Sequence, residues 1–317
     1  MWTLYDWFSG LMCLGSVFGA VAWAAWMQTL VTDFTGYYVL SPAQRQSLYA
    51  QSQYWVSAFD VMYAIEFLCL SVAKLLVLHR MADFAVPKGD GLSRRLAVWG
   101  RVVMAAVVVG NVVGLCGNVA AAVLSKQTGD LSNAAAAAFT ANSTEAANAF
   151  GVQAGQKATV ANDAASVQQF CEVAVLLIII LAFSVVGIAS ARRVSSALRH
   201  MNDEHGAAGR QLRRQIVGTA AVVFVTFLLR AVFSTMNALS RVLQIQVYTC
   251  NNPCDPACNN VWFVIQFWLQ FTPEFQLIVA LISSPLALLV ALWGMTNERT
   301  LQHMRSGRGQ MVTMRGS

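Results

Sequence analysis

The sequence predicts an all-α fold, a polytopic transmembrane helix bundle with six spans and both termini in the cytosol. Hydrophobic residues make up 57% of the 317 residues and charged residues 11%. This balance is too apolar for a soluble domain of that length. Apolar runs long enough to cross about 30 Å of hydrocarbon, at about 1.5 Å per residue, mark the spans. They cover residues 8–30, 54–78, 96–124, 170–189, 215–245 and 261–295.

Basic residues fall in alternate connections between these runs and set the orientation of the bundle. One side of the membrane, including the tail 297–317, carries Arg80, Lys88, Arg94, Arg95, Arg192, Arg193, Arg199, Arg210, Arg213, Arg214, Arg299, Arg305, Arg308 and Arg315. The other side carries Arg45, Lys126 and Lys157. Because cytosolic connections are enriched in Lys and Arg, the basic loops and both termini are predicted to be cytosolic. The formal charge of +6 then reflects membrane-edge anchors, and a nucleic-acid partner is rejected.

Each span has its own support. The first is retained as a helix because the start of the chain contains Asp6 and lacks the basic residues of a signal peptide. Tryptophans mark the predicted ends of later spans, as interfacial belts do. They are Trp55 and Trp262 on the outer side and Trp99 and Trp293 on the inner side. The last run would measure about 52 Å as a straight helix. We therefore predict a helix bent at Pro273 or Pro285, with two half-helices as the alternative.

The outer connection 125–168 is predicted to be a flexible or weakly helical loop. It is rich in Ala, Asn, Ser and Thr and has too little large apolar surface to build its own core. Asn142-Ser143-Thr144 within it is an N-glycosylation acceptor, which agrees with a lumenal or extracellular position. No separate soluble domain is predicted, so residues 1–317 form a single transmembrane domain.

Four cysteines are predicted to lie on the outer side, where an oxidising compartment favours two disulfides. They are Cys171, Cys250, Cys254 and Cys258, and the sequence leaves their pairing open. A zinc site at the last three is the alternative. It is disfavoured because all four histidines fall on the cytosolic side, so no metal site is predicted.

Charged and polar side chains inside the spans are the candidate functional residues, because charges in hydrocarbon are costly and usually face the bundle interior. The intramembrane polar cluster consists of Asp60, Glu66, Lys74, Arg230 and Glu274. Asn111 and Asn118 form a polar stripe on the third span, among Gly110, Gly114 and Gly117, which permit close helix packing. These groups predict either an ion or proton pathway or a structural ion-pair network, and the structural reading is favoured.

The sequence contains no motif of a hydrolase, a phosphate-binding loop or a zinc protease. We therefore expect no enzyme activity and no cofactor.

The C-terminal half resembles the tobamovirus multiplication protein family, plant seven-helix membrane proteins related to animal orphan receptor-like proteins of the lysosome. The resemblance rests on Val186-Gly187-Ile188 with Ala191-Arg192-Arg193, on Arg210 to Arg214, on Phe224 to Arg230 and on Ser283-Ser284-Pro285. It implies that the six spans correspond to the second to seventh helices of that family. It also implies a receptor-like or scaffold protein of the plasma membrane, vacuole or lysosome, with no known chemistry. The cysteine-rich turn, the Ala-rich outer connection and the long last run depart from the family pattern.

Three functions remain open from the sequence. The first is a receptor-like or scaffold protein whose basic loops engage cytosolic proteins or anionic lipid heads. The second is an ion channel or transporter that uses the charged cluster. The third is a subunit of a homo- or hetero-oligomeric membrane assembly, favoured if the glycines of the third span face a partner. Membrane lipids are partners in each case.

Overall fold

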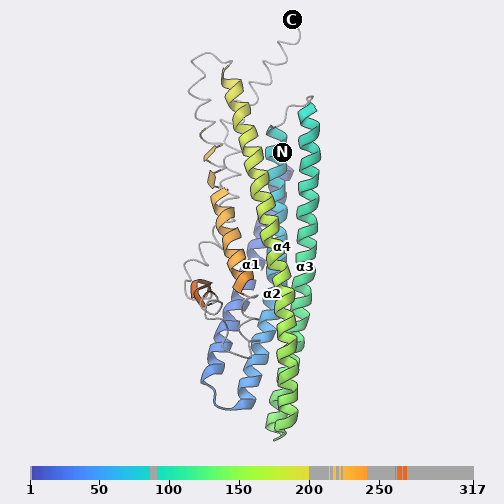
Figure 1. Cartoon of the computed structure of the whole chain (residues 1–317), viewed down its shortest axis with the longest axis vertical. Helices are drawn as coiled ribbons and strands as arrows, with labels where there is room; N and C mark the ends of the chain where they lie inside the picture. The colour runs from blue at the N-terminus through green and yellow to red at the C-terminus, as the bar shows by residue number, and fades with distance from the viewer. Residues whose placement is uncertain are drawn as a thin grey trace. The chain divides into compact units, whose positions relative to one another are not determined.

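The computed structural model describes residues 2–85, 91–199, 214, 217–218, 221–222, 224–240, 261, 263–265 and 267–269. Every secondary-structure element in these residues is a helix, which confirms the all-α class. The long helices are α1 (Trp2–Tyr38), α2 (Pro42–Ala85), α3 (Gly91–Thr140) and α4 (Thr144–Arg199), as Figure 1 shows. A shorter apolar helix covers Phe224–Ser240.

Four helices are long and apolar enough to cross a membrane, and they identify an integral membrane helix bundle. The apolar lengths are Asp6–Tyr38, Pro42–Leu76, Val98–Thr140 and Thr144–Ala189. Large apolar side chains such as Val102, Val109 and Leu181 are exposed, which suits a surface that faces lipid. The first four predicted spans overlap these helices, and Phe224–Ser240 lies within the fifth. Most of the sixth predicted span and the tail lie outside the described residues, so six spans and cytosolic termini stay predictions.

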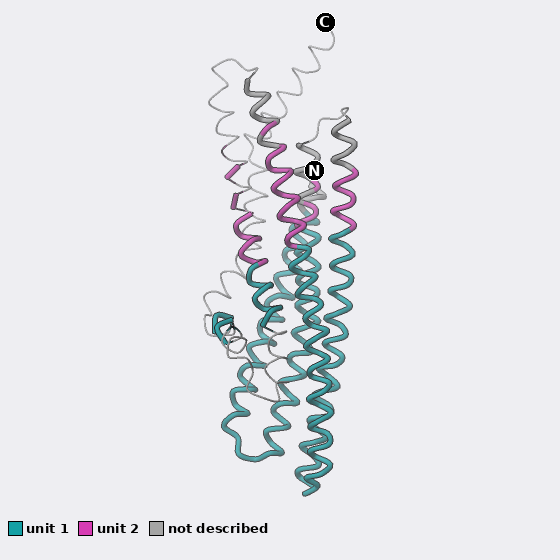
Figure 2. The backbone as a smooth tube through the Cα atoms, in the orientation of Figure 1, with its two compact units in different colours: residues 1–73, 106–175, 232–273 teal, residues 74–105, 176–231, 274–317 magenta. Residues whose placement is uncertain are grey.

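The described chain divides into two compact units, which are coloured separately in Figure 2. Unit 1 comprises Met1–Ala73, Ala106–Val175 and Val232–Pro273. Unit 2 comprises Lys74–Ala105, Leu176–Ala231 and Glu274–Ser317. In unit 2, the edge of the buried Phe227 ring meets Phe183, with ring centroids 5.8 Å apart.

Within unit 1, α3 buries one line of mostly small or polar side chains, which we call the α3 seam. It consists of Val107, Asn111, Gly114, Asn118, Ala121, Ser125, Thr128, Ser132 and Ala135. These positions alternate at steps of four and three residues, the heptad spacing of a left-handed coiled coil. A seam of small side chains brings two helix backbones close together.

Asn118 of the α3 seam contacts α2, and Gly114 of the seam contacts α4. The buried positions of α4 in unit 1 include Ala147, Ala154, Ala161, Ala165, Gln168, Glu172 and Val175. Glycines of α3 leave room for α4 at successive levels. A Cβ atom at Gly110 would lie 2.6 Å from the Val175 side chain, and one at Gly117 would lie 3.0 Å from the backbone oxygen of Ala164. The glycine face of the third span is therefore covered by α4 of the same chain.

Of the predicted flexible or weakly helical loop at residues 125–168, the flexible alternative is wrong, because α3 and α4 continue as helices through this segment and reverse only at residues 141–143. The reversal is a Schellman turn. The Ser143 amide donates to the Ala138 carbonyl, the Asn142 amide donates to that of Phe139, and Asn142 has a left-handed φ of 56°. The segment is helical because Ala has the highest helix propensity. Its small side chains also pack between helices without the large apolar surface that a separate core needs.

The α1–α2 pair is built differently. Between the two helices, Phe59 packs against Trp23 and Trp26, with ring centroids 6.3 and 5.2 Å apart. At the turn, Ser41 precedes Pro42, and the Arg45 amide donates to the Ser41 carbonyl. Pro at the first helical position is pre-set for helical φ and lacks an N–H that would have no helical partner.

Candidate functional site: a buried polar core

The centre of the polar core in unit 1 is Glu172 of α4, whose side chain is 0% exposed. One carboxylate oxygen accepts a hydrogen bond from the Tyr63 hydroxyl of α2 at 2.7 Å. The other accepts from the Ser234 hydroxyl of the helix Phe224–Ser240 at 2.9 Å. Three helices therefore meet at one carboxylate, and hydrogen bonds to it offset part of the cost of its burial.

Two amides lie close to Glu172 along α4. Gln168 precedes it by four residues and Gln169 by three, so both share its side of the helix. The Gln168 side-chain amide occupies the space that Gly114 leaves open on α3, because a Cβ there would overlap its Oε1. Its Nε2 atom is buried and has no hydrogen-bond partner among the described residues. The polar core therefore contains a buried hydrogen-bond donor that no described residue satisfies.

Asp60 and the predicted asparagine stripe lie at neighbouring positions in unit 1. The side-chain amide of Asn118 donates to the backbone carbonyl of Asp60 at 3.0 Å and so joins α3 to α2. Asn111 donates to the Val107 carbonyl of its own helix at 2.7 Å. Both asparagines are buried members of the α3 seam.

Glu66 is buried against α1. A Cβ atom at Gly19 would lie 2.8 to 3.1 Å from the carboxylate atoms of Glu66. Only glycine leaves enough space at this position for the carboxylate to sit against the α1 backbone. Gly19 is thus a positioning feature that the charge pattern alone did not reveal.

The remaining members of the predicted cluster belong to unit 2 or lie outside the described residues. Lys74 and Arg230 are both buried and belong to unit 2. The Lys74 Nζ atom lies 5.0 Å from the centroid of the Phe227 ring, a cation–π contact. Glu274 lies outside the described residues. The ion pairing proposed among Glu66, Arg230 and Glu274 stays a prediction.

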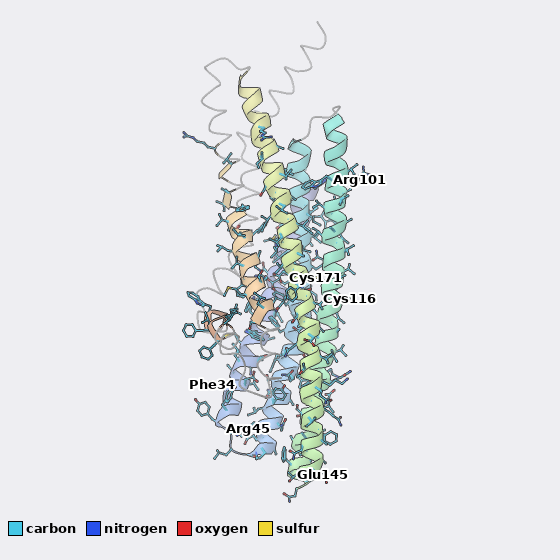
Figure 3. All side chains as sticks on the ribbon, viewed as in Figure 1. Phe34, Arg45, Arg101, Cys116, Glu145 and Cys171 are labelled. Atoms are coloured by element: carbon cyan, nitrogen blue, oxygen red, sulfur yellow. The ribbon has the colours of Figure 1, made fainter. Side chains whose placement is uncertain are left out.

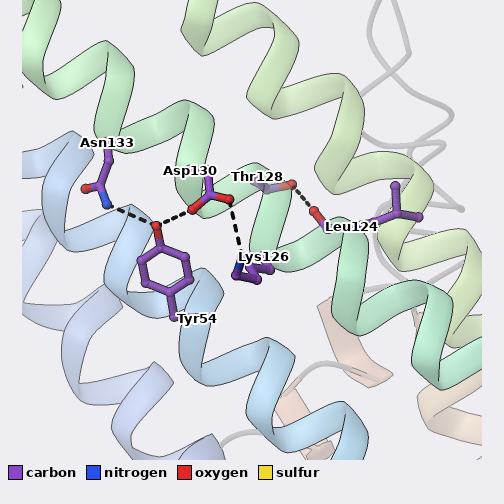
Figure 4. A network of polar contacts seen from close by, with 6 residues as sticks. All are labelled: Tyr54, Leu124, Lys126, Thr128, Asp130 and Asn133. Atoms are coloured by element: carbon purple, nitrogen blue, oxygen red, sulfur yellow. Dashed lines mark hydrogen bonds and ion pairs between the residues drawn. The ribbon is translucent and has the colours of Figure 1, made fainter.

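A second polar network joins α2 and α3, as Figure 4 shows. The Tyr54 hydroxyl donates to Asp130 Oδ1 at 2.7 Å and accepts from the Asn133 amide at 3.1 Å. Lys126 Nζ lies 3.9 Å from Asp130 Oδ2. Gly129 allows the tyrosine ring to approach, because a Cβ there would lie 2.7 Å from it. The network fixes the register of α2 against α3.

The predicted disulfide residues are only partly described. Cys171 is a half-buried free thiol on α4, close to the level of Cys116 on α3 in Figure 3. Its Cβ lies 3.4 Å from the Cβ position at Gly114, which makes it a packing residue of the α3–α4 interface. Cys250, Cys254 and Cys258 lie outside the described residues. Asn142, the glycosylation candidate, is exposed in the turn between α3 and α4.

Sequence reasoning missed Glu172, the most deeply buried acid that the structure describes. The available signal was the heptad spacing from Ala161 through Ala165 and Gln168 to Glu172 and Val175, which marks Glu172 as a core position. In the described part of the chain, no group of three or more His, Cys, Asp or Glu side chains is arranged to hold a metal ion.

Comparison with family models, with curated proteins and with solved structures finds no match to this chain. The resemblance to the tobamovirus multiplication proteins therefore stays a prediction, and the function must be argued from the helices and the polar core.

Proposed function

We propose that the protein is a receptor-like or scaffold integral membrane protein without catalytic chemistry, with six spans and both termini in the cytosol. The observation that carries this proposal is the unbroken course of α4 over 56 residues, from the α3–α4 turn to Arg199. At about 1.5 Å per residue such a helix measures about 84 Å, more than twice the roughly 30 Å of membrane hydrocarbon. One rigid element thus joins the outer hairpin to the basic, predicted cytosolic end.

The polar core connects α4 to two other helices. Glu172 of α4 is hydrogen-bonded to α2 through Tyr63 and to the helix Phe224–Ser240 through Ser234. A displacement of α4 along its axis would exchange or break these bonds together. Sliding of packed helices is a common form of conformational switching, and we propose that an event at the hairpin reaches the cytosolic side in this way.

An ion channel or transporter is the second candidate, because Asp60, Glu66 and Glu172 are three buried carboxylates in unit 1. Secondary transporters often bind substrate at breaks in their helices near the membrane centre. The helices α1 to α4 have no such break in the residues that the structure describes. This continuity favours the receptor-like or scaffold function. The third candidate, an assembly subunit, loses its original support because α4 covers Gly110, Gly114 and Gly117.

The finer features belong to the same proposal. The outer side carries the α3–α4 hairpin with a glycan at Asn142 and the cysteine-rich turn, with disulfides as the favoured state of the turn's cysteines. The basic loops face cytosolic proteins or anionic lipid heads. The plasma membrane or a vacuolar or lysosomal membrane is the proposed location.

A reconstitution experiment separates the first two candidates. Purified full-length protein and the Glu172→Gln variant are placed in liposomes, and Na⁺, K⁺ and proton flux are measured after size exclusion shows that both are folded. Silence from both folded proteins is expected. Flux in the wild type that Glu172→Gln abolishes would overturn the proposal in favour of a channel or transporter.

A second experiment supplies positive evidence. A photoreactive amino acid is placed at the exposed Arg192 near the end of α4, with the exposed Val109 as the lipid-facing control. In intact cells, a discrete adduct with a cytosolic protein is expected at Arg192 and lipid adducts are expected at Val109. Lipid adducts alone at both positions would contradict the scaffold function.

A further inference from the structure

Exposed apolar side chains continue along α1 to its very end. They are Leu14, Val17, Val21, Met27, Val31, Phe34, Tyr37 and Tyr38, followed by Leu40 in the turn. We call residues 31–40 the α1 tip. Tyr38 is 73% exposed and Leu40 is 92% exposed, so no other described part of the chain covers them. The Phe34 and Tyr38 rings meet edge to face, with centroids 5.1 Å apart.

Contacts inside unit 1 place the α1 tip at a defined level of the bundle. Trp26 of α1 packs against Phe59 of α2, and a Cβ atom at Gly36 would lie 4.0 Å from Leu48. The α2 residues Ala50 and Tyr54, which lie between those two contacts, pack against Gly129 of α3. The α1 tip therefore begins at the level of Gly129.

At this level the two sides of unit 1 have opposite surfaces. Near Gly129, α3 exposes the charged side chains of Lys126 and Asp130, whereas α1 exposes Val31 and Phe34. On α3 the exposed valines of the apolar part end at Val123. At this level, therefore, α1 exposes apolar side chains where α3 exposes charged ones.

The length of the exposed face on α1 fits a complete bilayer. Trp7 and Tyr38 are exposed aromatic residues near its two ends. They are about 46 Å apart along the helix at about 1.5 Å per residue. A bilayer measures about 40–45 Å with its headgroup layers, and amphipathic aromatic rings concentrate at both interfaces.

We propose that the α1 tip and the α1–α2 turn are embedded in the phospholipid headgroup layer on the hairpin side of the membrane. Phospholipid is the partner because exposed apolar side chains recur along α1 as far as the tip, where they flank the exposed Asp33 and end in tyrosines. The Arg45 guanidinium, which donates to the Val39 carbonyl at 3.0 Å, adds a positive charge that suits lipid phosphate. The α3–α4 hairpin extends past this layer into water. The proposal rests on membrane insertion alone and does not depend on whether the bundle is a receptor, a scaffold or a channel.

Site-specific photocrosslinking of the full-length protein tests this placement. A benzophenone amino acid replaces Tyr38 in protein reconstituted into phosphatidylcholine vesicles, and adducts are identified by mass spectrometry. Two valines with nearly equal exposure serve as the lipid-facing and water-facing controls. Val109 of α3 is 61% exposed in the apolar part of the bundle, and Val152 of α4 is 62% exposed on the outer hairpin.

Lipid adducts at Tyr38 at a yield close to that at Val109, and at least about tenfold above that at Val152, are the expected result. Adducts at Val109 also show that each preparation is folded and inserted. A crosslinked dimer at Tyr38 would overturn the proposal in favour of contact with a second copy. A Tyr38 yield as low as that of Val152 would overturn it by placing the tip in water.

Discussion

The two helical hairpins of unit 1 use different side chains for the same task of holding paired helices together. The α1–α2 hairpin packs Trp23 and Trp26 around Phe59 and exposes aromatic residues at its tip. The α3–α4 hairpin packs glycine, alanine, serine and threonine from the membrane to its turn. Close backbone packing does not require a large buried apolar surface, so it can operate in lipid and in water. The difference is consistent with the proposal that the α3–α4 hairpin extends past the headgroup layer while the α1 tip stays within it.

The largest effect is expected from overfilling the α3–α4 interface. In Gly117→Leu the new Cβ would lie 3.0 Å from the backbone oxygen of Ala164 and 3.4 Å from the backbone nitrogen of Gln168. Neither atom can move without α4, so a loss of about 3 kcal/mol in the free energy of unfolding is expected. Unfolding in mixed micelles followed by circular dichroism measures it.

Gly155→Leu on the same hairpin is the matched control. A Cβ there meets nothing within 4 Å, and leucine has the better helix propensity by nearly 1 kcal/mol. The control is expected to be at least as stable as the wild type. Equal losses in both variants would show that the α3–α4 interface is looser than the structure indicates.

The next effect is expected at the polar core. Glu172→Gln places an amide NH₂ opposite one of the two hydroxyl donors, Tyr63 or Ser234, while keeping the shape of the side chain. A hydroxyl that loses its buried acceptor costs about 1–3 kcal/mol of unfolding free energy. The exposed Asp163 of the same helix provides the matched control, and Asp163→Asn is expected within about 0.5 kcal/mol of the wild type. If Glu172→Gln matches that control, the carboxylate does not join the three helices.

A smaller effect is expected from the Tyr54 network, which ties the two hairpins together. Tyr54→Phe removes the hydroxyl that donates to Asp130 and accepts from Asn133. The expected loss is about 1 kcal/mol, the usual net value of one hydrogen bond in a partly exposed place. Tyr38→Phe, at an exposed ring of the α1 tip, is the control and is expected to be neutral. A double-mutant cycle of Tyr54→Phe with Asp130→Asn would contradict the network if the two losses simply add.

The smallest structural effect, with a clear readout of orientation, is expected at the α3–α4 turn. Expression in a eukaryotic secretory host should give a glycosidase-sensitive form that Asn142→Gln abolishes. Glycosylation of Asn142 would show that the α3–α4 turn lies on the lumenal or extracellular side. The α1–α2 turn lies toward the same end of unit 1, so the test assigns it to the same side. A chain that stays unglycosylated in that host would contradict the predicted lumenal or extracellular side.

Composition and apolar runs were sufficient to predict the helical class and the first four membrane helices. They also identified Asp60, Glu66, Asn111 and Asn118 as interior residues, and all four are buried. Glu172 and the helical outer hairpin were not predicted, for a common reason. Both depend on a heptad line of small side chains, and an average of hydropathy over a window gives Ala, Ser and Gly little weight. Contacts of Glu172 with Tyr63 and Ser234 join residues far apart in sequence, which no local pattern contains.

The α3 seam has a consequence for the membranes in which the protein can work. Its side chains keep the same spacing and stay small or polar from Asn111 to Ala135, so no single position along the seam marks where lipid must end. A thicker or thinner bilayer shifts the water boundary along α3 and α4 at a cost of only a fraction of a kcal/mol per Å. The hairpin therefore tolerates transfer between membranes of different thickness without repacking, while the aromatic α1 tip determines how deep the bundle sits.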